Sequence, residues 1–242
     1  MSLSPLAVIT GGLSGIGKET ALAFLHLNYR VVVLDVPETS NGFLPSEISY
    51  FSCDVSQEES VKSVFEQIES QFGVPDILVA NAGILGPRKA VENYPTDDFN
   101  RVIDINIKGV WYCMKNVLPG MKARKSGKII TTASVAGHVG MAGHIAYSAS
   151  KHAVLGMTKT LALEVAKFGI HVNAVCPGFT ETAMLDSAEV DENYKKGLLF
   201  ATPMKRFGHP SEIASAIVFL ASDASSFMTG QGIILDGGLS IQ

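Results

Sequence analysis

Two polar side chains near the middle of the chain have types and spacing suited to proton transfer. Tyr147 and Lys151 stand four residues apart, so a helix that contains both would place them on one face. A phenol ionises near pH ~10 in water, and a neighbouring ammonium group favours the phenolate. Moving that pKa toward neutrality takes about three units, or roughly 4 kcal/mol, which Lys151 and a bound cation together could supply. The pair is a candidate general acid/base.

Ser134 could assist this chemistry at a substrate oxygen. It follows the β-branched segment Lys128–Thr132, so its hydroxyl is expected at the C-terminal end of a strand, where α/β proteins form their sites. There it could donate a hydrogen bond as charge develops on the oxygen. A Tyr and a Lys four residues apart also occur on solvated helix faces. The interpretation therefore depends on the motifs around them.

The segment T-G-G-L-S-G-I-G, Thr10–Gly17, is a glycine-rich turn that fits two kinds of nucleotide. With Lys18 it nearly spells the phosphate loop of nucleoside triphosphatases. That loop needs Ser or Thr after the lysine to hold Mg²⁺, and this chain has Glu19. Between a strand and a helix N-terminus, the same turn suits the pyrophosphate of a dinucleotide. The sequence therefore favours a dinucleotide.

Asp35 supports that choice and predicts which dinucleotide binds. It ends the next expected strand, 18 residues after Gly17, where an acid accepts hydrogen bonds from the adenosine ribose hydroxyls. A 2′-phosphate on this ribose would meet the carboxylate at close range, and neither Ser14 nor Val36 offers a cation to offset the repulsion. We therefore expect NAD(H) rather than NADP(H).

Short β-branched segments alternate with helical patterns along the whole chain. Most are continuously apolar, which is typical of parallel strands covered on both faces. Strands are expected at Leu6–Thr10, Arg30–Asp35, Ile48–Ser52, Asp76–Ala80, Lys128–Thr132, Ile170–Cys176 and Gly232–Asp236. Helices are expected at Lys18–Leu27, from Ser56 onward, and at Phe99–Ala123, Tyr147–Phe168 and Ser211–Ala221. Without a linker or repeat, this alternation predicts one α/β domain over residues 1–242, a doubly wound parallel sheet of Rossmann type with helices on both faces.

The composition argues against several classes of protein. With 47% hydrophobic and 17% charged residues, the chain is that of a globular protein. The net charge of −4 and the scattered Lys and Arg argue against nucleic-acid binding, and no apolar run reaches the roughly 20 residues that span a bilayer. Cys53, Cys113 and Cys176 are expected to be reduced and buried in a cytoplasmic protein, and no ligand spacing indicates a metal site.

Together these motifs make the chain resemble the short-chain dehydrogenase/reductase family over essentially its whole length. The turn from Thr10 matches the cofactor turn of that family, and Ser134, Tyr147 and Lys151 have its catalytic spacing. One difference is Ala80, where many members have Asn. The other matching segments are Asp54–Val55, A-N-A-G at Ala80–Gly83, Asn106, P-G-F-T-E-T at Pro177–Thr182, and Asp236–Gly238.

The resemblance implies a role for each matched position. Tyr147 would be the general acid/base, Lys151 would lower its pKa and bind the nicotinamide ribose, and Ser134 would polarise the carbonyl or alcohol. Asn106, the fourth catalytic position, would hold a water that relays protons. The cofactor is expected to contact Gly11, Ser14, Gly15, Ile16, Gly17, Asp35, Asp54, Val55, Asn81, Ala82, Gly83, Tyr147, Lys151, Pro177, Gly178, Thr180 and Thr182. Asp54 could also cap a helix and Asn81 could also tie strands together.

A substrate pocket is expected between His138–Ala146 and a long insertion at Thr180–Gly208, which is a candidate lid. The predicted substrate contacts are Ser134, Met141, His144, Tyr147 and Phe179, although a loop histidine such as His144 could instead be solvated. His138 and Trp111 are weaker candidates. The expected walls are largely apolar and favour a hydrophobic ketone or cyclic alcohol over a sugar; they comprise Val139, Met141, Ile145, Phe179, Met184 and Leu185.

These expectations describe an NAD-dependent oxidoreductase that interconverts a secondary alcohol and a ketone. One alternative is a reductase of 3-oxoacyl thioesters, and many reductases of this kind use NADPH. The other is a regulator that senses NADH without turnover. Family members are usually tetramers, assembled partly through the helices that here are expected at Phe99–Ala123 and Tyr147–Phe168. We expect a homotetramer in which small residues allow close helix approach, namely Ala149, Ala153, Gly156, Ala162 and Ala166.

Overall fold

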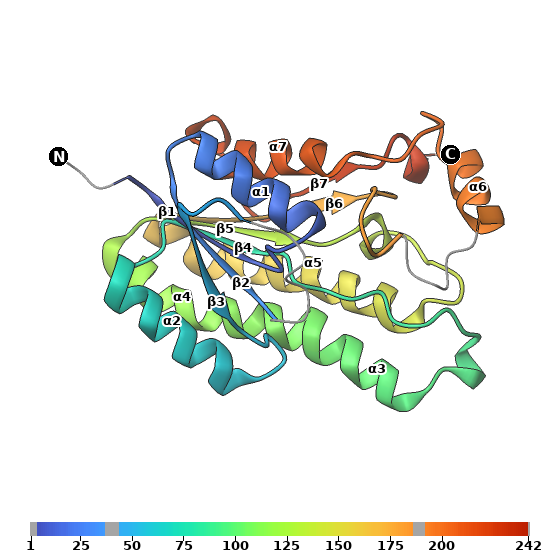
Figure 1. Ribbon diagram of the computed structural model, residues 1–242, viewed down its shortest axis with the longest axis horizontal. Helices are drawn as coiled ribbons and strands as arrows, with labels where there is room; N and C mark the ends of the chain where they lie inside the picture. Colours follow the sequence, from blue (N-terminus) through green and yellow to red (C-terminus); the bar gives the residue numbers. More distant parts are fainter. Residues whose placement is uncertain (1–3, 37–43, 186–191, 242) are drawn as a thin grey trace.

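A single parallel sheet forms the centre of the protein. The structure is a computed structural model that describes residues 4–36, 44–185 and 192–241. Seven strands lie in the order β3-β2-β1-β4-β5-β6-β7, all parallel, which confirms the predicted fold (Figure 1). Each boundary is within one residue of its predicted position: β1 (Leu6–Thr10), β2 (Arg30–Asp35), β3 (Ile48–Ser52), β4 (Ile77–Ala80), β5 (Gly127–Thr132), β6 (Ile170–Pro177) and β7 (Gly232–Leu235).

The burial of the strands explains their continuously apolar sequences. Every residue of β1 and β4, which lie side by side in the middle of the sheet, is buried. Strand β3 lies at the sheet edge and is less buried: Ile48 is buried, whereas Tyr50 and Ser52 are exposed. A strand covered on both faces needs apolar residues at successive positions, whereas an edge strand also accommodates exposed and polar residues.

Helices cover both faces of this sheet in two layers (Figure 1). Helices α1 (Gly15–His26) and α7 (Pro210–Ala221) pack against each other on one face, around a core that includes Phe24 and Ile217. The opposite core includes Phe65 and Met121 and is covered by α2 (Glu58–Phe72), α4 (Val110–Arg124) and α5 (Ile145–Val165). The two remaining α-helices of the described chain are α3 (Thr96–Ile103) and α6 (Glu192–Ala201).

The long helix predicted at Phe99–Ala123 is divided in the structure. Helix α3 ends at Ile103, a π-helical turn spans Asp104–Gly109, and α4 continues from Val110. Asn106 lies in this turn and is fully buried. A π turn is wider than an α turn by one residue and often marks a functional position. The apolar spacing continues through the segment, so periodicity alone does not distinguish the π turn from an α-helix.

The insertion predicted at Thr180–Gly208 forms a loop whose two ends meet. Thr180 and Gly208 form a parallel bridge, and Gly208 N donates to Phe179 O over 2.9 Å. Helix α6 lies within this loop, although only an irregular lid was expected. Residues 186–191, which belong to the predicted lid, lie outside the described residues. The closed base fixes where the loop leaves and rejoins the sheet.

Within residues 4–36, 44–185 and 192–241, no helix combines the length and the apolar character needed to cross a membrane.

Candidate active site

The glycine turn links β1 to α1 where the winding of the sheet reverses. Strand β1 lies between β2 and β4, an arrangement that leaves a crevice at the C-terminal ends of the strands. Gly11 has a φ of 64°, and a Cβ on Gly17 would lie 2.0 Å from the Gly11 carbonyl oxygen, so side chains are excluded from both positions. Within the described chain, the Ser14 side chain does not cap α1. The first N–H groups of α1 are therefore suited to an anionic ligand.

The Asp35 carboxylate is held beside this turn by backbone groups. Its Oδ2 atom accepts a hydrogen bond from Leu13 N over 2.9 Å, and its Oδ1 atom accepts from Val36 N, also over 2.9 Å. These bonds fix the carboxylate at the C-terminal end of β2. A carboxylate oxygen can accept more than one hydrogen bond, so this geometry is compatible with ribose hydroxyl donors.

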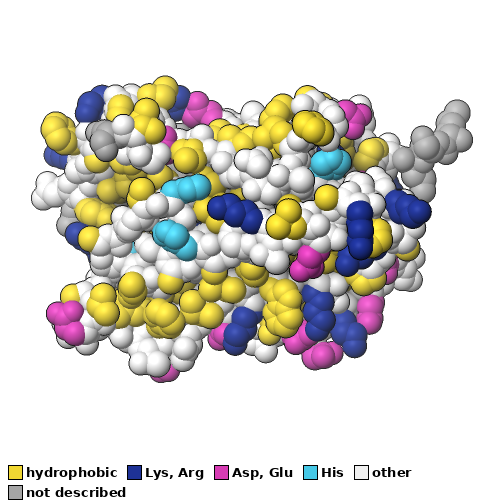
Figure 2. Space-filling model, turned by 180° about the vertical axis from the view of Figure 1, so that it is seen from behind, with side chains coloured by type: hydrophobic (Ala, Val, Ile, Leu, Met, Phe, Trp, Pro, Cys, Tyr) yellow, Lys and Arg dark blue, Asp and Glu magenta, His cyan; other side chains and the backbone are white. Residues whose placement is uncertain are grey.

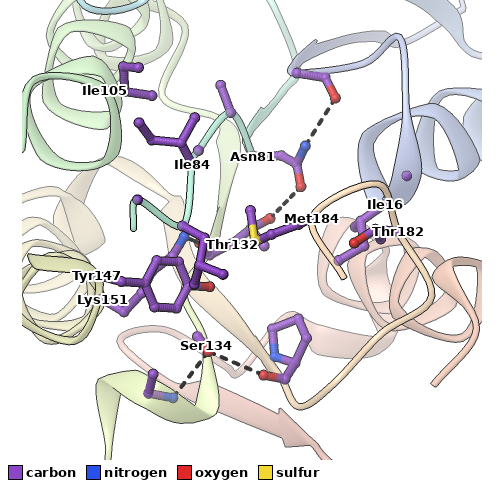
Figure 3. Close-up of a pocket in the computed structure, with 18 of the residues that line it drawn as sticks. Ile16, Asn81, Ile84, Ile105, Thr132, Ser134, Tyr147, Lys151, Thr182 and Met184 are labelled. Atoms are coloured by element: carbon purple, nitrogen blue, oxygen red, sulfur yellow. Dashed lines mark hydrogen bonds between the residues drawn. The ribbon is translucent and has the colours of Figure 1, made fainter. Parts of the chain in front are cut away.

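Tyr147 and Lys151 lie together in the first two turns of α5, as predicted, and their side chains point toward the same space as Ser134 (Figure 3). Lys151 Nζ is 5.5 Å from the centroid of the Tyr147 ring and donates to Thr132 O over 2.7 Å. Ser134 follows β5, and its hydroxyl accepts from Ala136 N over 3.1 Å. All three side chains are buried.

Burial dominates the electrostatics of this group. It raises the pKa of Tyr147 above the usual 10.0, against a smaller lowering by the hydrogen-bonding interaction with Ser134. It also lowers the pKa of Lys151 to about 8. Lys151 therefore does not bring the pKa of Tyr147 below its usual value in the protein chain by itself, because desolvation of the phenolate raises that pKa; the predicted lowering by Lys151 together with a bound cation stays a prediction. A further positive charge beside the phenol is needed.

A single cavity connects the glycine turn with these side chains. Its volume is about 1520 Å³, and its wall runs from Asp35 at one end to Ser134 and Tyr147 at the other. Every predicted cofactor contact lines this cavity except Gly17, which lies behind the turn against the Gly11 carbonyl. The continuous cavity, the uncapped start of α1 and the fixed Asp35 carboxylate together are compatible with a dinucleotide.

Several known proteins are similar to this chain in sequence and in fold. The family described as Enoyl-(Acyl carrier protein) reductase matches residues 11–240. The 3-oxoacyl-[acyl-carrier-protein] reductase FabG of Thermotoga maritima is 39% identical over 243 residues, which cover 98% of each chain. The chain belongs to the short-chain dehydrogenase/reductase family.

Two further relatives illustrate the range of this family. Secoisolariciresinol dehydrogenase of Forsythia intermedia is 36% identical over 247 residues, which cover 98% of this chain and 89% of the relative. A solved structure described as ElxO with NADP bound has a TM-score of 0.89 and 35% identity, covering 99% of this chain and 100% of that one. This short-chain dehydrogenase/reductase is an oxidoreductase that acts on alcohol or ketone groups, and its family uses NAD(P)(H).

Asn106 lies behind the cavity wall of this dehydrogenase/reductase. Its side-chain amide exchanges two hydrogen bonds of 2.9 Å with the backbone of Ile84 and donates to Ser150 Oγ over 3.1 Å. A Cβ on Gly83 would lie 3.2 Å from Asn106 Oδ1 and 3.6 Å from Lys151 Nζ. The amide therefore fixes the Gly83–Ile84 segment beside the lysine. Its predicted role in holding a water stays a prediction.

Of the alternative roles considered for Asp54 and Asn81, that of Asn81 occurs in the structure and helix capping by Asp54 does not. Asp54 Oδ1 accepts from Ser56 N over 2.9 Å, which stabilises the turn before α2, but the N-cap residue of α2 is Gln57. Asn81 Nδ2 donates to the carbonyl oxygens of Thr10 and Gly11 over 3.1 and 3.2 Å, which ties β4 to β1. Both residues also line the cavity, so these contacts are compatible with cofactor binding.

The segment after β6 lies along the cavity and reaches the glycine turn. Thr180 Oγ1 donates to Gly178 O over 3.2 Å, which compacts the chain after Pro177. A Cβ on Gly15 would lie 3.0 Å from the Thr182 methyl group, so Thr182 lies directly against the turn, next to Ile16 in Figure 3. This contact joins the predicted nicotinamide-binding segment to the start of α1 beside the cavity.

The predicted substrate contacts lie at the Tyr147 end of the cavity. Met141, His144 and Phe179 all line it, and His144 is 2% exposed, so the solvated alternative for this histidine is wrong. Among the expected apolar wall residues, Val139, Met184 and Leu185 also line it. Three candidates do not: Ile145 and Trp111 are exposed, and His138 faces Gly232. Ile145 points outward because it begins α5 one position before the buried Ala146.

The cavity wall also contains residues that sequence reasoning missed. Tyr194 and Leu198 reach it from α6, and Leu239 and Ser240 reach it from the turn that follows β7. Asp236 holds that turn by accepting from Gly238 N over 2.9 Å and from Ser240 N over 2.8 Å. The sequence did contain a clue to the second pair, because Asp236–Gly238 matched the family. That segment was not, however, assigned to the substrate pocket.

No group of three or more His, Cys, Asp or Glu side chains has an arrangement that could hold a metal among the residues that the structure describes.

Proposed function

We propose that this enzyme is an NAD(H)-dependent oxidoreductase that interconverts a secondary alcohol and a ketone. One observation carries the proposal: a single cavity has Asp35 at one end and Ser134, Tyr147 and Lys151 at the other. When bound, the cofactor would supply hydride transfer between its nicotinamide ring and the carbinol carbon. Gly11, Ser14, Gly15, Asp35 and the other cavity-lining contacts given above would hold it.

The chain itself would manage the proton and the substrate oxygen. Tyr147 would take the hydroxyl proton during oxidation and return it during reduction, and Ser134 would donate a hydrogen bond to the same oxygen. The positive charge of Lys151, kept close to the Tyr147 ring, favours the phenolate that accepts the proton. The oxidised nicotinamide would add the further positive charge that burial of Tyr147 makes necessary.

The preference for NAD(H) rests on the position of Asp35. Its carboxylate is fixed beside Leu13, so it cannot turn away from a 2′-phosphate without losing two hydrogen bonds. The solved structure of ElxO holds NADP, so the fold by itself does not select NAD(H). The negative charge of Asp35 is therefore the feature of this chain that would select between the two cofactors.

A second candidate is the reduction of a 3-oxoacyl thioester. The 39% identity to FabG of Thermotoga maritima favours it. The apolar lining contributed by Met141, Phe179, Met184 and Leu185 fits the acyl chain of such a thioester as well as a hydrophobic ketone or cyclic alcohol.

The test is a turnover assay that follows nicotinamide absorbance. NAD⁺ and NADP⁺ are offered with aliphatic, cyclic, aryl and steroid secondary alcohols, and NADH and NADPH with a 3-oxoacyl thioester. Turnover of an apolar alcohol with NAD⁺ is the expected result. Activity on the thioester alone would support the second candidate, and NADH binding without turnover on any substrate would support a sensing role.

We further propose that the enzyme is a homotetramer assembled partly through α5. Ala149 and Gly156 are exposed on this helix, and Leu163 is 85% exposed. Ala162, which was expected on the same face, is instead buried within its own chain. Figure 2 shows several patches of apolar side chains on one face of the molecule, interspersed with polar and charged groups.

We predict that Gly156→Leu dissociates the tetramer without unfolding the chain. A Cβ on Gly156 meets nothing within 4 Å, so the chain itself tolerates a side chain there, whereas a closely packed second α5 would not. Light scattering coupled to size exclusion is expected to give a tetramer for the wild type and a smaller species for the variant. Gly197→Leu on α6 is the matched control, because its Cβ also meets nothing within 4 Å. A tetrameric Gly156→Leu variant would contradict the proposed interface.

A further inference from the structure

Thr132 occupies a position that the proposed mechanism does not use. It ends β5, lines the cavity, and supplies the backbone carbonyl that accepts a hydrogen bond from Lys151 Nζ over 2.7 Å. Its own hydroxyl points away from the lysine and donates to Asn81 Oδ1 over 3.1 Å (Figure 3). One residue therefore contacts the lysine through its backbone and Asn81 through its side chain.

Asn81 extends this connection to the glycine turn. While its Oδ1 atom accepts from Thr132, its Nδ2 atom donates to Thr10 O and Gly11 O over 3.1 and 3.2 Å. The two carbonyl oxygens set the orientation of the amide, because a flipped Asn81 would face them with its own oxygen, and Oδ1 is thereby turned toward the Thr132 hydroxyl. Gly11 belongs to the turn suited to the pyrophosphate. Hydrogen bonds through Thr132 and Asn81 thus connect Lys151 with the glycine turn.

From this chain of contacts we propose that the Thr132 hydroxyl is a positioning group that couples the glycine turn to Lys151. By anchoring to Asn81, it fixes the carbonyl against which the lysine ammonium is held. A cofactor that orders the glycine turn would then also order the lysine. This inference rests on the proposed function, which gives Lys151 its task.

Because Lys151 is buried, its pKa is sensitive to the position of the Thr132 carbonyl. Lys151 is 4% exposed, and its pKa is already lowered to about 8 by burial. The titratable groups that face it are Tyr147 on the same helix and Cys176 on β6. If the Thr132 carbonyl shifts, the ammonium loses a close acceptor and its charged form is disfavoured further. The pKa of Lys151 then falls, and activity that needs its charge is lost at a lower pH.

The neighbouring threonine provides a matched control for a test. Thr131 lies on the other face of the same strand, is fully buried, and forms a hydrogen bond of 2.9 Å with the Thr158 hydroxyl. Thr131→Val and Thr132→Val are therefore the same chemical change at adjacent positions, and each removes one side-chain hydrogen bond. The bond lost in Thr132→Val is the one to Asn81, whereas the bond lost in Thr131→Val is the one to Thr158. Thr132→Ser keeps the hydroxyl and serves as the conservative rescue.

The experiment measures cofactor affinity and the pH profile for all three variants. Relative to wild type, Thr132→Val is expected to weaken the binding of whichever of NADH and NADPH the wild type prefers by about tenfold. The alkaline limb of its kcat profile is expected to move to lower pH by about half a unit. Thr131→Val and Thr132→Ser are expected to stay within about twofold of wild type in affinity, with an unmoved profile.

Two outcomes would overturn the inference. One is equal losses in Thr131→Val and Thr132→Val, which would indicate a merely structural role for both hydroxyls. The other is a Thr132→Val variant with unchanged affinity and pH profile. Cofactor affinity is measured by fluorescence without turnover. A wild type that binds cofactor but oxidises no alcohol would therefore refute the proposed function while the comparison of the threonine variants still decides this inference.

Discussion

Tyr147→Phe is expected to lower kcat by about 10³-fold while leaving the NADH dissociation constant within about twofold of wild type. The variant loses only the hydroxyl that would exchange a proton with the substrate. The phenyl ring still fills the same buried position in α5, 5.5 Å from Lys151 Nζ. Single-turnover kinetics would measure the chemical step, and NADH fluorescence would measure binding.

Tyr112→Phe is the matched control for this prediction. It is the same substitution on α4, and Tyr112 does not belong to the cavity wall. Its kcat should equal that of the wild type within about twofold. If Tyr147→Phe loses NADH binding in proportion to its activity, the tyrosine acts in binding and its role as acid/base is wrong.

The second large effect is expected at Asp35. Asp35→Ala should lower the ratio of kcat/KM with NAD⁺ to kcat/KM with NADP⁺ by about 100-fold, or roughly 2.7 kcal/mol. The carboxylate repels a 2′-phosphate and accepts hydrogen bonds from ribose hydroxyls, and the substitution removes both effects. The measurement is a pair of initial-rate series with the same alcohol and each cofactor.

The ratio contains its own control for damage to the glycine turn. Asp35 also accepts hydrogen bonds from Leu13 N and Val36 N, so its removal loosens the turn. That loss weakens both cofactors alike and cancels in the ratio, whereas the charge effect does not. A ratio that stays the same in Asp35→Ala would mean that Asp35 holds the turn but does not select the cofactor.

The regular part of the fold could be predicted because its causes are local. A strand buried on both faces, such as β1 or β4, must be apolar at successive positions, and that pattern is visible in the sequence. The π turn around Asn106 could not be predicted, because the apolar spacing continues through it and the contacts of Asn106 are with Ile84, 22 residues away. Helix α6 was missed because a mixed polarity is equally typical of an irregular loop.

The residues of the candidate site could be predicted more fully than the pKa values of their side chains. The spacing of Tyr147 and Lys151 on one helix follows from helical geometry and is confirmed. Whether Lys151 lowers the Tyr147 pKa depends on how deeply both groups are buried, and no spacing encodes burial. Thr132 was missed for a related reason: its partner Asn81 is 51 residues away, and a threonine at a strand end is common for its β-branched shape alone.

The cavity wall has a consequence for the order of events during synthesis and assembly. It contains Gly11 from the first crossover of the sheet and Leu239 and Ser240 from the turn after the last strand. Because these distant segments must all be in place, a growing polypeptide emerging from the ribosome cannot present the complete cavity wall until β7 and the turn after it have docked. A ligand that contacts the whole wall therefore binds the folded chain and stabilises it by mass action.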